Sequence, residues 1–130
     1  MEYKMNTIKV LELIRKGDFD RDFIDIYVDA EQLEYQKERY TKAITKFIEW
    51  YGDEEINIFS APGRSEIGGN HTDHQHGKVL ACAINKDAIG IVKKEKTDEV
   101  RIVSDDADEI VVDITNLTIR EEENGSTLAL

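Results

Sequence analysis

The hydrophobic period of the chain changes at Gly52, and this change limits the folds open to it. Before Gly52, apolar residues recur at helical intervals from Asp29 onward, where Asp29 and Gln32 have the spacing of a capping box. Gly52 itself suits the left-handed residue that ends many helices. The apolar stripe of this predicted helix comprises Leu33, Tyr40, Ala43, Ile44, Phe47, Ile48 and Tyr51. Short apolar runs with turn residues follow, so we expect an α+β fold in which N-terminal helices precede a mixed or mostly antiparallel sheet.

A further helix is predicted near the N-terminus. Asn6 or Thr7 is available as its N-cap, and Gly17 is placed to end it. Its apolar face consists of Ile8, Val10, Leu11, Leu13 and Ile14. The apolar residues between 23 and 28 fit either another helical turn or an extended piece, and the sequence leaves that choice open.

Several short strands are expected in the second half. One covers 56–59 and ends at 61–63. The run 79–84 is continuously apolar, which is typical of a strand covered on both faces. The residues 85–87 have turn chemistry, so the run 88–92 is predicted to be its hairpin partner. Two more strands are predicted at 100–103 and 110–114, separated by the acidic turn 105–108.

The charge balance excludes some classes of partner. With 17 Lys plus Arg and 28 Asp plus Glu among 130 residues, the formal net charge is −11. Nucleic-acid binding and electrostatic binding to a membrane surface both depend on basic residues, so neither is expected. No apolar run approaches the roughly 20 residues of a membrane-spanning helix, and the N-terminus lacks the apolar core of a secretory signal.

The single cysteine, Cys82, cannot form an internal disulfide, which favours a cytoplasmic protein. Because it lies within an apolar run, it is predicted to be a buried, inert thiol.

The segment 61–77, APGRSEIGGNHTDHQHG, differs from everything around it. It contains all three histidines of the chain, its one proline and four of its eight glycines. Glycines permit positive φ and close approach of the backbone to a ligand, while the polar side chains supply donors and acceptors at short range. The composition therefore predicts a binding loop between two strands.

The residues of this segment leave three interpretations open. In the first, Asn70, His71 and Asp73 hydrogen-bond a polyhydroxylated ligand, with Arg64 as a fixed charge for phosphate oxygens. In the second, a metal such as zinc is bound by His71, Asp73, His74 and His76. In the third, the segment is a polar surface turn without a special role.

The motif closely resembles the first signature of galactokinases. Ala61-Pro62-Gly63-Arg64 is followed by Gly69, then His71-Thr72-Asp73, then Gly77. The galactokinase signature runs Gly-Arg-Val-Asn-Leu-Ile-Gly-Glu-His-Thr-Asp-Tyr, with a glycine shortly after. The resemblance covers about residues 31–115 and places the chain near a superfamily that also includes homoserine, mevalonate and phosphomevalonate kinases.

The resemblance implies roles for individual residues. Its glutamate, histidine and aspartate contact the sugar hydroxyls, and their positions hold Asn70, His71 and Asp73, with Thr72 among the substrate-binding residues. Its arginine, beside the sugar and the transferred phosphoryl group, corresponds to the predicted catalytic residue Arg64.

The sequence departs from the signature in two ways. Asn70 replaces the glutamate and so removes one charge and a strong acceptor. Ser65, Glu66, Gly68 and His74 also differ from the family pattern, so the resemblance implies a relative of galactose as the substrate more strongly than galactose itself.

The resemblance implies the N-terminal part of a sugar kinase fold, with a helical extension over 1–30 and the front of the kinase N-terminal domain over 31–130. The complete enzyme would transfer the γ-phosphoryl group of ATP, with magnesium, to the anomeric hydroxyl of galactose or a related sugar. The Gly- and Ser-rich phosphate loop of such kinases is not in this sequence, and the residues 126–130 look like the start of a helix. We therefore expect the front part of a longer protein, inactive alone.

Two rivals from other classes remain. One is a non-enzymatic sugar-binding or sensing module that keeps the recognition loop. The other is a metal-dependent hydrolase that uses the histidine cluster.

Overall fold

The computed structural model describes residues 5–69, 76–105, 107–116, 118, 121–123 and 125. The predicted α+β class is confirmed, because three N-terminal helices are followed by antiparallel strands in two small sheets. The chain forms two compact units, residues 1–93 and residues 94–130, and each is described by itself. None of the described helices combines the length and apolar character needed to cross a membrane.

Both ends of the first helix follow from its sequence and from one distant carboxylate. Helix α1, Thr7–Lys16, ends at Gly17, which has φ 84° as predicted. Asn6 occupies the N-cap position, but its side chain makes no capping hydrogen bond. Instead, Asp53 Oδ1 accepts hydrogen bonds from the Ile8 backbone N–H at 3.0 Å and from Thr7 Oγ1 at 2.8 Å. A residue far along the chain therefore caps this helix.

The segment that the sequence left open is helical. Helix α2 spans Asp20–Tyr27, and a short 3-10 helix follows at Ala30–Gln32. The Asp29 carboxylate accepts from the Glu31 backbone N–H at 2.9 Å, so it caps this 3-10 helix. Helix α3 then begins at Leu33, runs to Tyr51 and ends at Gly52, whose φ is 79°.

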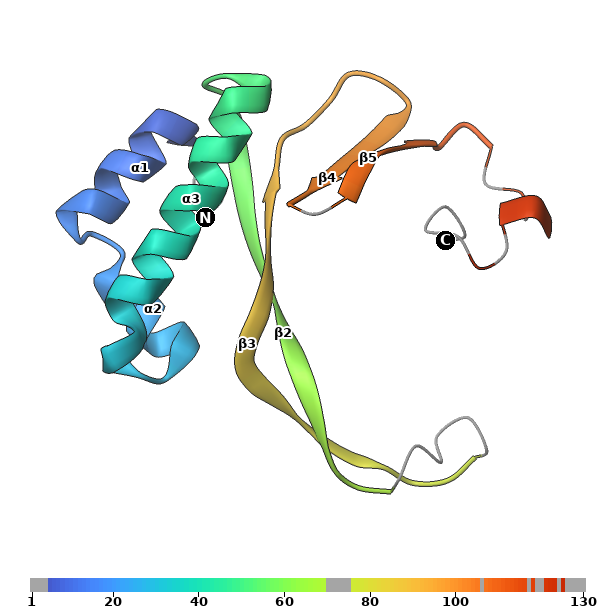
Figure 1. Ribbon diagram of the computed structural model, residues 1–130, viewed down its shortest axis with the longest axis horizontal. Coiled ribbons are helices and arrows are strands. Elements are labelled where there is room, and N and C mark those ends of the chain that lie inside the picture. Colours follow the sequence, from blue (N-terminus) through green and yellow to red (C-terminus); the bar gives the residue numbers. More distant parts are fainter. Residues whose placement is uncertain are drawn as a thin grey trace. The chain divides into compact units, whose positions relative to one another are not determined.

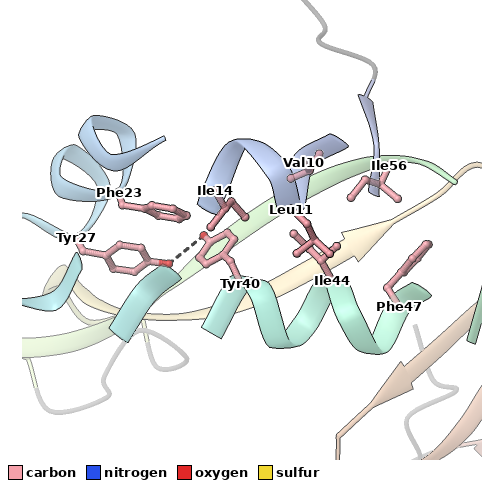
Figure 2. Packing of buried hydrophobic residues seen from close by; sticks show 9 residues of the cluster. All are labelled: Val10, Leu11, Ile14, Phe23, Tyr27, Tyr40, Ile44, Phe47 and Ile56. Carbon is pink, nitrogen blue, oxygen red and sulfur yellow. Dashed lines mark hydrogen bonds between the residues drawn. The ribbon is translucent and has the colours of Figure 1, made fainter. Parts of the chain in front are cut away.

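The core of the first unit lies between the helices and one face of a three-stranded sheet. This sheet has the order β1-β2-β3, with β1 at Met5–Asn6, β2 at Glu55–Gly68 and β3 at Leu80–Val92, and its pairs are antiparallel. Figure 2 shows how side chains from α1, α2, α3 and β2 meet in this layer. The buried apolar residues are Val10, Leu11, Ile14, Phe23, Tyr27, Tyr40, Ile44, Phe47 and Ile56.

The strands of the first unit differ from the prediction. β2 does not end at 61–63 but continues to Gly68, and β3 is one strand with no turn at 85–87. The two strands pair with each other from Asn57↔Val92 to Gly68↔Leu80, so 79–84 and 88–92 are not hairpin partners. The physical reason is that Asp87 pairs with Pro62 of β2 and its side chain forms hydrogen bonds with α2, α3 and β2, so it takes no part in a local turn.

The expectation of a strand covered on both faces is also wrong. Leu80 is 61% exposed, and Cys82 is an exposed thiol rather than a buried one. Figure 1 shows the reason: the helices lie against only part of the β2–β3 ribbon, and its other half extends past them.

The second unit contains a two-stranded hairpin. β4 spans Glu99–Ser104 and β5 spans Ala107–Asp113, which confirms the two predicted strands, but residues 107 and 108 of the predicted acidic turn belong to β5. The Ile114 backbone N–H donates to Asp98 O at 2.9 Å at the open end of the hairpin. A short 3-10 helix lies at Glu121–Glu123.

Candidate functional site

The two longest strands carry the segment that the sequence singled out. Residues 61–68 belong to β2, and the described residues 76–79 lead into β3 at the far end of the ribbon (Figure 1). The first part of the predicted binding loop is therefore strand. Its residues 70–75 lie outside the described residues.

Four of the five predicted site residues cannot be located. Asn70, His71, Thr72 and Asp73 lie outside the described residues, and so does His74. Of the proposed metal ligands, only His76 is described, and it is exposed with φ 62°. Within the described part of the chain, no group of three or more His, Cys, Asp or Glu side chains is arranged to hold a metal ion.

Arg64 is the predicted site residue that the structure does locate. It is exposed on β2 and pairs with Ala83, immediately beyond a shift in strand register. Its guanidinium forms no hydrogen bond or ion pair with any residue that the structure describes. Arg64 thus lies exposed on the described part of the ribbon, close in sequence to residues 70–75 but without a described partner.

One glycine of the segment is required by close approach. Gly69 has φ +116°, and a Cβ on it would lie 2.6 Å from both Lys78 O and Val79 Cα. At Gly63, where the register shifts, a Cβ would lie 3.2 Å from Lys86 O, a tight contact that a small shift of the neighbour relieves. A side chain at Gly69 would push apart the backbone segments that continue β2 and precede β3.

A polar cluster that the sequence did not predict lies at the middle of the ribbon. It consists of Tyr27, Arg39, Tyr40, Ser60 and Asp87 and is called the Asp87 cluster below. The Arg39 guanidinium donates to Asp87 Oδ1 at 2.9 Å and to the Asp87 backbone O at 3.1 Å. Tyr27 OH and Ser60 Oγ each donate to Asp87 Oδ2 at 2.7 Å. The Asp87 side chain, only 3% exposed, thus connects β3 to α2, α3 and β2.

The electrostatics of this cluster favour an ionised Asp87. Burial acts to raise the pKa of the Asp87 carboxyl, but hydrogen bonds from Tyr27, Ser60 and Arg39 and the charge of Arg39 outweigh it and hold the pKa below its ordinary value. Burial, and then hydrogen bonds to Tyr40 and Asp87, raise the pKa of Tyr27. The hydroxyls of Tyr27 and Tyr40 lie 3.0 Å apart (Figure 2). A neutral tyrosine therefore donates to a carboxylate here.

A groove of about 370 Å³ lies between α1, α2 and β2. Its lining is mainly apolar, with Asp22, Asn57 and Ser60 as polar members. The apolar lining comprises Met5, Val10, Ile14, Phe19, Phe23, Ile26, Tyr40, Ile56 and Ile58. It contains none of the predicted site residues, and its few polar groups do not offer the dense donors and acceptors that sugar hydroxyls require.

Comparison with known families identifies the segment. The galactokinase galactose-binding signature matches residues 45–94, which include the last turns of α3, the whole β2–β3 ribbon and its tip. The chain carries the galactose-binding signature of galactokinases. Helices α1 and α2 lie outside the matched galactokinase region.

Individual galactokinases also match part of the chain. The galactokinase of Clostridium tetani is 37% identical over 59 residues, which is 45% of this chain and 15% of that protein. The galactokinase of Enterococcus faecalis is 31% identical over 67 residues, covering 52% of this chain and 17% of that protein. For the galactokinase of Streptococcus thermophilus the identity is 35% over 82 residues, or 61% of this chain and 21% of that protein. The chain thus spans about a fifth of the length of these relatives, and no solved structure gives a significant match.

Proposed function

We propose that this chain is the sugar-recognising portion of a galactokinase-type enzyme, which transfers the γ-phosphoryl group of ATP to the anomeric hydroxyl of galactose or a related sugar. The observation that carries the proposal is the galactose-binding signature over residues 45–94. The ribbon supports it, because its described part carries the exposed Arg64 of this signature and extends past the helices (Figure 1).

The proposed sugar contacts are made by the tip. Asn70, His71, Thr72 and Asp73 bind the hydroxyls, since a carboxylate beside an imidazole supplies the paired acceptors and donors that a sugar needs. Arg64 stabilises negative charge at the transferred phosphoryl group, for which its exposed guanidinium is suited. The single cysteine supports a cytoplasmic location.

ATP and magnesium belong to the proposed reaction through the family alone. The described residues do not fit either group, because they offer no cluster of metal-ligating side chains and the sequence lacks a Gly- and Ser-rich phosphate loop. We therefore derive no step of phosphoryl transfer from this chain, and we expect it to phosphorylate nothing by itself.

The proposal is tested by titrating the chain with D-galactose, D-glucose and D-mannose and following its amide NMR signals. We expect saturable binding of galactose or of a close relative, lost in Asp73→Ala and weakened in Arg64→Ala. Arg15→Ala is the matched control, because Arg15 is an exposed arginine on α1. No saturable binding of any sugar related to galactose, or unchanged affinity in both site variants, would contradict the proposal. One equivalent of zinc retained through purification would favour the metal-dependent alternative.

A further inference from the structure

The Asp87 cluster lies where the β2–β3 ribbon leaves the helices. On the covered side, Ile89 and Ile91 of β3 pack against the apolar core. On the other side, residues 80–86 of β3 are all exposed. Asp87 is therefore the last residue of β3, in the direction of the tip, that the helical layer holds.

The strand register changes at the same point. Asp87 pairs with Pro62, and the next pair toward the tip is Arg64↔Ala83, so β3 advances four residues where β2 advances two. A bulge of this kind bends a ribbon and increases its twist. The direction of the described part of the ribbon beyond the bulge, which includes Arg64, therefore depends on how the strands are fixed at Asp87.

The side chains fix that point from three directions. Tyr27 of α2 and Arg39 of α3 hold Asp87 from the helices, while Ser60 ties it to β2. A two-stranded ribbon is at best marginally stable without further packing, and no described element covers the far half of this one. The contacts at Asp87 are therefore the main interactions that set the direction of the far half of the ribbon.

We propose that Asp87 is a positioning residue for sugar recognition: by joining α2, α3 and β2 at the bulge, its carboxylate sets the direction in which the ribbon presents Arg64. This inference rests on the proposed function. It assigns no contact with the sugar to Asp87, which acts through the backbone of the ribbon.

The test compares Asp87→Ala with Asp53→Ala. Asp53 is a suitable control because its carboxylate also joins distant parts of the fold, but at the start of α1 instead of at the bulge. Residual dipolar couplings of the amides of Arg64, Ser65, Ala81 and Cys82, taken relative to those of α3, report the direction of the ribbon. NMR titration with D-galactose, or with the related sugar that the chain binds, reports the affinity of the chain for that sugar.

In Asp87→Ala we expect altered couplings beyond the bulge and sugar binding weakened about tenfold or more, since displacing a binding group by roughly an ångström has effects of this order. The side-chain oxygen of Asp87→Asn can still accept one of the hydrogen bonds that Asp87 accepts. We therefore expect this variant to have couplings and a sugar affinity between those of Asp87→Ala and the wild type. Asp53→Ala is expected to keep the wild-type couplings and affinity at temperatures where it is folded.

Unchanged couplings in Asp87→Ala would overturn the inference, and so would an equal loss of affinity in Asp53→Ala. If Asp87→Ala does not fold, the couplings of Asp87→Asn and Ser60→Ala test the positioning role of Asp87 instead. Wild-type couplings in both variants would overturn the inference. If the wild-type chain binds no sugar, the proposed function fails while the couplings still test the positioning role.

Discussion

The Arg39 guanidinium donates to Asp87 Oδ1 at 2.9 Å and so joins α3 to β3 across 48 positions of the sequence. The Asp87 side chain is 3% exposed and that of Arg39 is 26% exposed, so water screens the pair only weakly. Removing one partner leaves the other charge without compensation in a partly buried place, which is more costly than losing an exposed ion pair.

We expect Asp87→Ala to lower the free energy of unfolding by about 3 kcal/mol, the cost typical of breaking a buried charge pair. The measurement is urea unfolding followed by circular dichroism. The double variant Asp87→Ala with Arg39→Met is the control, because it removes the stranded cation and should recover part of the loss. A loss below about 1 kcal/mol would place the pair among exposed ion pairs and contradict this prediction.

The stability contributed by Asp87 should depend on pH. Its folded pKa lies below the ordinary value of 3.8, so the unfolded chain takes up the proton at a higher pH than the folded chain does. The contribution is therefore complete above about pH 5 and is lost as the pH falls through the folded pKa. Comparing urea unfolding at about pH 6 and about pH 3, we expect the wild type to lose more stability than Asp87→Asn. Equal losses in the two proteins would contradict this.

Asp53 should stabilise α1 from outside that helix. Its carboxylate accepts hydrogen bonds from Ile8 N–H and Thr7 Oγ1, and these bonds lower the pKa of Asp53. We expect Asp53→Ala to lower the melting temperature and to speed amide hydrogen exchange in α1. Asp25→Ala is the matched control, because the Asp25 side chain is 70% exposed and pairs, within the part of the chain that the structure describes, with the exposed Arg21 at 3.8 Å. A similar effect of both substitutions on exchange in α1 would argue against the capping role.

The helices were predictable because their signals are local. Gly17 and Gly52 end α1 and α3 where their positive φ values require a residue without Cβ, and the apolar spacing of each helix is visible within a few turns. The capping of α1 was not predictable, since its acceptor Asp53 lies 45 positions from Ile8.

The course of β2 and β3 was mispredicted, and the Asp87 cluster was not predicted, for the same physical reason. A tripeptide such as 85–87 has turn chemistry only while its side chains are free to bond their own backbone. Here Asp87 bonds residues 27, 48 and 60 positions away, and β2 pairs with β3 on both sides of residues 84–86, so tertiary contacts override the local preference. The signature segment was recognisable because its glycines and histidines are concentrated in one stretch of the sequence.

The tip of the ribbon gives the sharpest contrast between neighbouring residues. A Cβ on Gly69, which has φ +116°, would lie 2.6 Å from Lys78 O and Val79 Cα, whereas a Cβ on Gly68 would meet nothing within 4 Å. We therefore expect Gly69→Ala to cost at least about 1 kcal/mol of stability and to weaken sugar binding, with Gly68→Ala close to wild type in both. Urea unfolding and NMR titration measure the two effects. If the two substitutions behave alike, the close approach of β2 and β3 at Gly69 is not what shapes the tip.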